Sequence, residues 1–160
     1  MGNLANRRVS NTLIGIAGVH YVVSELSRRG LIAMPTIRNT AGIDILVAKP
    51  DGSGQAVLQV KTAVEIKTSQ KEGRQWWPMS KPSGCLMGPN AFYVFVRYDQ
   101  YKERFEAFLE SADAVIKQIE ENLKDDRALN PKRKEFPCWG LPKSVQEQER
   151  LANNWRTWRP

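Results

Sequence analysis

The stretch of sequence that most constrains the fold is GIDILVAKPDGSGQAVLQVKT, at residues 42–62. It contains two runs in which apolar residues recur at every second position, a pattern typical of strands because successive side chains point to opposite faces. Residues 50–54 between the runs are rich in turn formers. We therefore predict a hairpin with one aliphatic face, and with Asp44, Gln59 and Lys61 on the other face.

The length of the turn decides which residues of the hairpin lie opposite one another. A two-residue turn at residues 51–52 places Asp44 opposite Gln59. A four-residue loop over residues 51–54 places Asp44 opposite Lys61 instead. An odd loop without a bulge would move Asp44 to the other face, because a slip of one residue turns every side chain over. We expect an even loop, or a bulge that restores the phase.

The polar face of this hairpin has two interpretations. Burying an unpaired charge is costly, so these groups must pair with one another or bind a ligand. In the first interpretation, Asp44 and Lys61 form an ion pair in a solvated groove. In the second, oxygens of Asp44, Gln59 and Val60 bind a divalent cation. Lys61 then stabilises negative charge on a phosphate.

Asp44, fourteen intervening residues and then the run QVKT at residues 59–62 resemble the motif of the PD-(D/E)XK nuclease superfamily. The form GIDILV…LQVKT is similar to a prokaryotic branch in which glutamine replaces the acid before the lysine, a branch close to archaeal Holliday-junction resolvases. The resemblance covers residues 15–111. It implies the restriction-endonuclease-like fold, an α/β fold with a mixed sheet flanked by helices. It also implies Mg²⁺- or Mn²⁺-dependent cleavage of DNA, with Asp44, Gln59 and Lys61 as catalytic residues.

A helix is predicted ahead of the hairpin. One of the polar residues 10–12 caps it, it runs to Arg29, and Gly30 closes it. Apolar residues wrap most of its circumference, so we expect it to be buried on more than one side. Gly15 and Gly18 would permit a close approach to another backbone.

This helix departs from the pattern of the family it resembles. In the family, the helix gives a glutamate to the metal site, and Val19 holds that position here. His20 is adjacent and is a possible helix ligand, although a structural or surface role also fits a single histidine. Glu25 lies on another side of the helix, and we expect it to pair with Arg28 or Arg29.

The remaining elements are predicted from composition and capping residues. Strands are expected at residues 31–38, interrupted by Pro35 and so at an edge or bent, at 91–98, and at 104–109 in a hairpin with the preceding strand; helices are expected after Ser111, to about residue 126, and after Ser144. The order helix, strand, hairpin, strand, strand, helix fits the fold of the nuclease superfamily.

Residues 68–90 form the longest irregular stretch, in which basic residues stand beside aromatic ones. Such a mixture suits a groove that contacts phosphates and stacks bases, and the alternative is a set of solvated cations. The candidate DNA-binding residues are Lys67, Lys71, Arg74, Trp76 and Lys81. We expect one of Trp76 and Trp77 to be buried and the other exposed. The basic segment at residues 130–143 is either solvated or in contact with DNA.

The distribution of charge also indicates a polyanionic partner. Residues 1–100 contain 12 Lys and Arg against 6 Asp and Glu, a net charge of +6, whereas residues 101–160 contain 12 against 11, a net charge of +1. The basic excess therefore accompanies the hairpin, which suits DNA as the partner.

Length and composition limit the classes of protein to which this chain can belong. We expect a single domain over residues 1–160, with a C-terminal extension at about 130–160. The longest apolar run is too short for a membrane span, and the N-terminal residues do not resemble a signal peptide. Two cysteines and a single histidine cannot form a zinc site, so we expect reduced thiols in the cytoplasm.

Two functions follow from these observations. The first is a DNA-binding, divalent-metal-dependent endonuclease, and the alternative is a catalytically silent nucleic-acid-binding or dimerising module on the same fold. An enzyme acting on another phosphorylated substrate has no sequence feature in its favour. We also expect a homodimer, with Trp155, Trp158 or the edge of the strand at residues 91–98 as its apolar contact.

Overall fold

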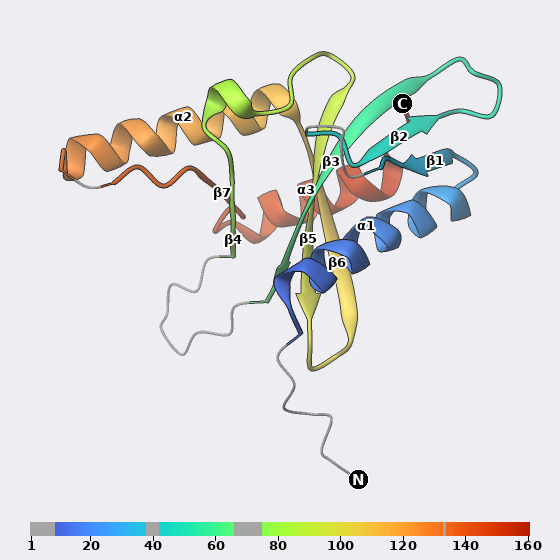
Figure 1. The fold of residues 1–160 in the computed structure, drawn as a ribbon, viewed down its shortest axis with the longest axis horizontal. Helices are drawn as coiled ribbons and strands as arrows, with labels where there is room; N and C mark the ends of the chain where they lie inside the picture. The colour runs from blue at the N-terminus through green and yellow to red at the C-terminus, as the bar shows by residue number, and fades with distance from the viewer. Residues whose placement is uncertain (1–8, 38–41, 66–74, 133) are drawn as a thin grey trace, which may run out of the picture.

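The computed structural model describes residues 9–37, 42–65, 75–132 and 134–160 (Figure 1). In chain order the elements are α1 (Asn11–Arg28), β1 (Ile32–Pro35), β2 (Ile45–Ala48), β3 (Gln55–Val64), β4 (Trp76–Pro78), a short 3₁₀ helix (Pro82–Gly84), β5 (Ala91–Asp99), β6 (Arg104–Ser111), α2 (Ala112–Leu129), β7 (Cys138–Gly140) and α3 (Val145–Thr157).

The α-helices begin where capping residues predict. The side-chain oxygens of Ser10, Ser111 and Ser144 each accept a hydrogen bond from the backbone N–H three residues further on. Ser10 is therefore the cap among the three candidates for α1, and the other two predicted caps are confirmed. Gly30 closes α1 with φ +81°, a left-handed conformation that glycine adopts without strain.

Among the described residues, five strands form a mixed sheet in the order β1-β2-β3-β5-β6. The β3–β5 pair is parallel, and the other neighbours in this sheet are antiparallel. A separate two-stranded ribbon pairs β4 with β7. A mixed sheet flanked by helices confirms the predicted α/β fold class, and β1 lies at the edge that Pro35 indicated.

The hairpin of β2 and β3 adopts the first of the two predicted registers. Ile45 lies opposite Leu58, as the two-residue turn predicts, and the regular pairing ends there, because the Asp44 N–H donates to the Leu58 carbonyl. The Lys49 N–H donates to the Gly54 carbonyl at 2.9 Å and closes the turn. The even register keeps Ile45 and Val47 of β2 and Ala56, Leu58 and Val60 of β3 on one buried face.

Helix α1 is buried along a single stripe, so the expectation of burial on several sides is wrong. Its buried residues are Ile14, Gly18, Val22 and Leu26, which recur every four positions. Leu13 and Ile16 are exposed. The helix lies as an outer layer against the sheet, and much of its outer side is exposed.

Gly18 and Gly15 differ in their surroundings. A Cβ on Gly18 would lie 1.9 Å from the Thr62 Oγ1, whereas one on Gly15 would have no atom within 4 Å. The predicted close approach is therefore confirmed for Gly18 and wrong for Gly15. The close approach at Gly18 brings α1 into contact with β3 at Thr62, one residue beyond Lys61.

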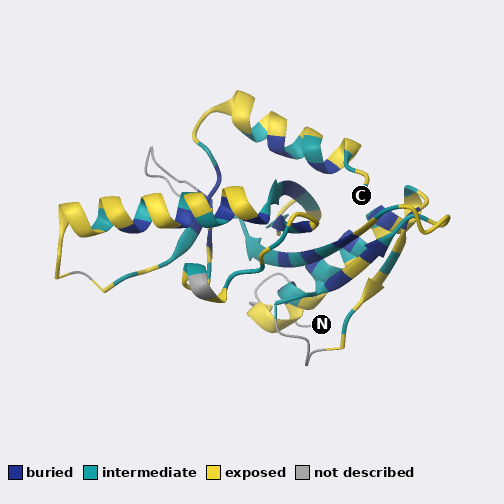
Figure 2. Cartoon of the chain, turned by 90° about the horizontal axis from the view of Figure 1, so that it is seen from above, coloured by how far each residue is buried: buried dark blue, intermediate teal, exposed yellow. Residues whose placement is uncertain are grey.

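Two cores lie on the two faces of the sheet. The aliphatic core contains side chains of α1 and even-numbered residues of β3 and β5, among them Val22, Leu58 and Val94. The aromatic core contains side chains of α2 and odd-numbered residues of β5, together with Trp77 and Trp139. In Figure 2 the buried residues follow the sheet and the inner sides of α2 and α3, and the outer sides of the helices are exposed.

The C-terminal part of the chain contributes to both cores. Helix α3 packs against the outer strand β6 and sends Leu151 into the aromatic core and Trp155 into the aliphatic core. Trp158 also packs against the aliphatic core, and β5 is paired on both sides. The three surfaces proposed from sequence for a dimer contact are therefore occupied within the chain. None of the described helices is long and apolar enough to cross a membrane.

Candidate functional site

Asp44 lies where β2 and β3 separate. Its backbone N–H donates to the Leu58 carbonyl and its carbonyl accepts from the Thr36 N–H, both at 2.9 Å. One step further along β3, the strand partner is missing, and the Asp44 Oδ2 accepts the Val60 N–H at 2.7 Å. The carboxylate thus replaces a backbone acceptor at the end of the ladder.

The Val60 carbonyl lies on the same edge of β3 as this carboxylate. The N–H groups of Val57 and Glu65 donate to the carbonyls of Asn90, just before β5, and Tyr98 in β5, so odd-numbered residues of β3 direct their peptide groups toward β5. Even-numbered residues direct theirs to the opposite edge, and the N–H and C=O of one strand residue point the same way. The structure therefore brings together two of the predicted metal ligands, Asp44 and the Val60 carbonyl.

The Gln59 and Lys61 side chains lie on the face of β3 that is turned away from α1. Thr62 faces Gly18 of α1, whereas Val57 packs against the aromatic core, so odd-numbered side chains of β3 point away from α1. No ion pair joins Asp44 to Lys61 in the described residues. The prediction of one shared hairpin face is wrong for Asp44, because its carboxylate turns into the plane of the sheet to meet a strand N–H.

A pocket of about 430 Å³ opens beside Asp44 and Val60, against the N-terminal half of α1. Its lining includes Val19 and His20, and the Thr36 hydroxyl at its rim donates to the Ile43 carbonyl at 2.5 Å. Val19 also packs against the aliphatic core, and His20 is exposed. Asp44 is the only acidic residue in this lining, so any cation here would depend on neutral ligands for the rest of its coordination.

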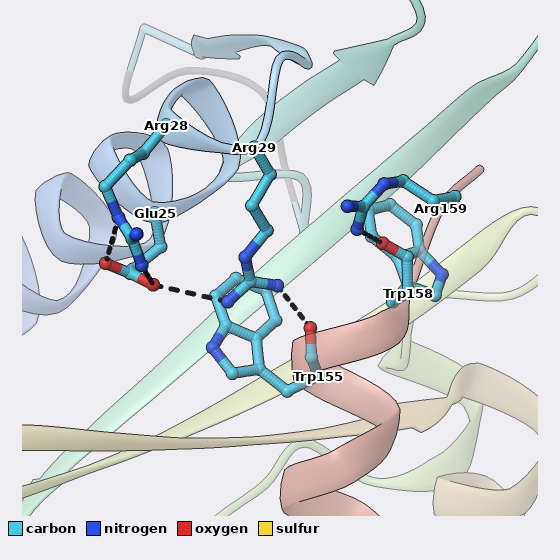
Figure 3. A network of polar contacts seen from close by, with 6 residues as sticks. All are labelled: Glu25, Arg28, Arg29, Trp155, Trp158 and Arg159. Atoms are coloured by element: carbon cyan, nitrogen blue, oxygen red, sulfur yellow. Dashed lines mark hydrogen bonds and ion pairs between the residues drawn. The ribbon is translucent and has the colours of Figure 1, made fainter.

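Glu25 is directed away from this pocket and into a contact between α1 and α3 (Figure 3). Its carboxylate binds Arg28 at 3.0 Å and Arg29 at 3.3 Å, which confirms the predicted pairing. The hydrogen bonds from Arg28, and then from Arg29, lower the pKa of Glu25 below its usual value. The Arg29 guanidinium also stacks over the Trp155 ring, at 4.4 Å from its centroid, and donates to the Trp155 carbonyl.

The predicted DNA-binding residues have different outcomes. Lys67, Lys71 and Arg74 lie outside the described residues. Trp76 is 41% exposed and Trp77 is 1% exposed, which confirms one exposed and one buried tryptophan. Alternation along β4 explains the difference, because Trp77 points into the aromatic core and its Nε1 donates to the Val96 carbonyl at 3.2 Å.

Lys81 and the surroundings of Trp76 involve residues that sequence analysis did not single out. Lys81 pairs with Glu135 at 3.3 Å, and the Trp76 ring contacts Phe136 edge to face, with 5.3 Å between centroids. These residues meet because β4 pairs with β7, and no local pattern predicts a contact between segments so distant in sequence.

The mixed sheet and its flanking helices define an α/β domain. Among solved structures, the chain is similar to a bacterial homing endonuclease, I-Ssp6803I, with a TM-score of 0.50 and 16% sequence identity over 87% of this chain and 80% of that one. No protein-family model and no curated protein sequence matches the chain.

Proposed function

We propose that this chain binds DNA and acts as a divalent-metal-dependent endonuclease that hydrolyses DNA phosphodiesters. The observation that carries the proposal is the Asp44 carboxylate held at the edge of β3 beside the Val60 carbonyl, in a fold similar to that of a homing endonuclease. The net charge of +7 suits a polyanionic partner.

The donor set at this edge suits a hard cation such as Mg²⁺ or Mn²⁺. Asp44 uses Oδ2 to accept the Val60 N–H, which leaves its other oxygen for a cation. The Val60 carbonyl is a neutral oxygen ligand of the kind these cations accept, and the Gln59 amide is another, although it lies on the opposite face of β3. A bound cation would polarise a phosphate and lower the pKa of a water molecule. Since Asp44 brings the only full negative charge, we expect weak cation affinity.

Lys61 and His20 have supporting roles in this proposal. Lys61 carries its ammonium group on a long flexible stem, which suits it to stabilise charge on a phosphate at the strand edge. His20 lines the pocket that Asp44 lines. An imidazole ligand would favour Mn²⁺ over Mg²⁺.

A catalytically silent nucleic-acid-binding or dimerising module on the same fold is the second candidate. It is favoured by the scarcity of ligands, since the described residues contain no group of three or more His, Cys, Asp or Glu side chains placed to hold a metal ion. The direction of the Gln59 and Lys61 side chains, away from the pocket, also favours it.

Cleavage assays on linear, branched and single-stranded DNA, with Mg²⁺ or Mn²⁺, test the endonuclease proposal. We expect slow cleavage that is faster with Mn²⁺. Asp44→Asn should abolish cleavage but leave DNA binding intact, because the amide oxygen still accepts the Val60 N–H while the charge is lost. Lys61→Ala should also abolish cleavage, and Lys117→Ala, on the exposed side of α2, is the matched control.

The outcomes separate the two candidates. Cleavage that survives Asp44→Asn would place the active site elsewhere. DNA binding without cleavage in any metal would favour the silent module. No DNA binding even at low salt would exclude the endonuclease and a nucleic-acid-binding module that binds DNA, and would leave only the dimerising module.

We also propose that the chain forms a homodimer, in which a two-fold axis would match the two strands of duplex DNA. The edge strand β1 supports this, because Ile32 and Met34 are exposed there and, with Leu46, line an apolar groove of about 550 Å³. We expect light scattering to report twice the chain mass, and Met34→Lys to shift it to the monomer. A monomeric wild type at high concentration would exclude this proposal.

A further inference from the structure

The β4–β7 ribbon has one buried face and one exposed face. Trp77 lies opposite Trp139, and both are buried in the aromatic core. Trp76 lies opposite Gly140 on the other face. Because glycine has no side chain, the ribbon itself places nothing across from the Trp76 ring on this outer face.

Trp76 and Phe136 form an exposed aromatic pair on this outer face. Their rings meet edge to face, at an interplanar angle of 85°, and the residues are 41% and 47% exposed. Large aromatic side chains normally bury most of their surface, and here Trp77 and Trp139 do so from neighbouring positions. Two half-exposed rings in contact, set nearly at right angles to each other, provide an exposed apolar surface at the protein boundary.

Cations border this aromatic pair. Glu135, next to Phe136, binds Arg127 at 2.6 Å and Lys81 at 3.3 Å. Hydrogen bonds from Arg127, and then from Lys81, lower the pKa of Glu135, so the carboxylate stays charged and neutralises about one of these two cations. Lys134 is exposed two residues from Phe136. The border of the aromatic pair therefore keeps a positive charge, which complements a phosphate backbone.

We propose that Trp76 and Phe136 form a stacking platform for unpaired bases of DNA, with Lys81, Arg127 and Lys134 contacting the adjacent phosphates. A base inside a duplex has both faces covered by its neighbours, whereas an unpaired base offers a face to an aromatic ring. The inference rests on the proposed function, since it assumes that the chain binds DNA. It narrows the substrate class to DNA that contains unpaired or splayed nucleotides.

Three DNA molecules of equal length test the platform in a binding titration. They are a fully paired duplex, the same duplex with a short unpaired loop, and that loop made of abasic nucleotides. The abasic loop keeps the phosphates and the flexibility but removes the bases. We expect wild-type protein to bind the loop of intact bases most tightly, and the abasic loop no more tightly than the duplex.

Substitutions then assign the preference to the platform. Trp76→Leu and Phe136→Leu keep an apolar side chain but remove the ring, and each should weaken binding to the intact loop by about 5- to 100-fold, with little change for the duplex. Trp76→Phe, which keeps an aromatic ring, should retain most of the preference for the loop of intact bases. Tyr101→Ala, which removes an exposed ring from the β5–β6 turn, is the matched control.

The result distinguishes this inference from the proposed function. Equal binding of wild type to all three DNA molecules, or a loop preference that survives both leucine variants, would overturn the platform while DNA binding stands. No binding to any of the three would reject the proposed function itself, and the platform with it.

Discussion

The two faces of the sheet are closed in different ways. On the aromatic face, Trp139 stacks on Phe95 with 3.7 Å between centroids, and Trp77 packs against both rings. On the aliphatic face, α1 contacts β3 through a glycine, and the pocket beside Asp44 lies at the end of this contact. The aromatic face is filled by large rings, whereas the contact of α1 with β3 on the aliphatic face requires that Gly18 has no side chain.

This difference separates stability from the candidate site. The aromatic core joins segments far apart in the chain, so each ring there stabilises several connections at once. The aliphatic face fixes the distance between α1 and β3, and hence the shape of the pocket that Asp44 and His20 line. We therefore expect substitutions in the aromatic core to cost mainly stability, and substitutions around Gly18 and Asp44 to alter the site as well.

The largest effect is expected for Trp139→Ala. Trp139 is 2% exposed, and its removal leaves a cavity beside Phe95 and Trp77. We expect a loss of about 3–5 kcal/mol in the free energy of unfolding, measured by denaturant titration. Trp76→Ala, in the same ribbon but exposed, is the control and should cost far less. Similar losses for both variants would mean that the aromatic face is not the more stabilising one.

Gly18→Ala should give the next largest effect. The new Cβ would lie 1.9 Å from the Thr62 Oγ1, so α1 must shift away from β3. We expect a loss of about 1–3 kcal/mol in the free energy of unfolding. Thr62→Ala should relieve part of this loss in the double variant, because it removes the two side-chain atoms Oγ1 and Cγ2.

Gly15→Ala is the matched control for the same helix. A Cβ there meets no atom within 4 Å, so alanine should stabilise the helix by about 0.5–1 kcal/mol. A destabilising Gly15→Ala, or a neutral Gly18→Ala, would contradict the view that a single glycine sets the approach of α1.

Asp44→Ala should cost about 1–3 kcal/mol in the free energy of unfolding, because the Val60 N–H loses its acceptor at a largely buried position. Asp44→Asn should cost less, since its amide oxygen can accept the same hydrogen bond. Thermal unfolding of both variants measures the difference. Equal losses would show that the charge, and not the hydrogen bond, gives Asp44 its structural role.

The smallest effect concerns Glu25 and pH. Its folded pKa is lowered, so its contribution to stability is complete above the unfolded pKa and is lost as pH falls through the folded pKa. Glu25→Gln should lower the Tm at neutral pH by about 2 °C or less, and the difference from wild type should vanish in acid. A difference that persists at pH values below the folded pKa would contradict this assignment.

Much of the fold follows from short-range pattern. The alternation of β2 and β3 predicts a hairpin of even register, and serine caps predict where α2 and α3 begin. Alternation also predicts that one of Trp76 and Trp77 is buried. These features depend on residues within a few positions of one another, so local sequence is enough to specify them.

The candidate site was predicted only in part. Sequence singles out Asp44, Gln59 and Lys61, and it predicts the register of β2 and β3. It does not predict that the Asp44 carboxylate turns to the Val60 N–H, because that turn occurs only where β2 leaves the ladder. The exposed partner of Trp76, Phe136, was missed for a similar reason.

By itself, then, the sequence determined the hairpin, the helix starts and the two faces of each strand, since periodicity and capping act between near neighbours in the chain. Only the tertiary structure decided that β5 pairs in parallel with β3, that β4 meets β7, and that α1 buries a single stripe. Those contacts join distant segments, and they form because the whole set of apolar faces is buried together in two cores.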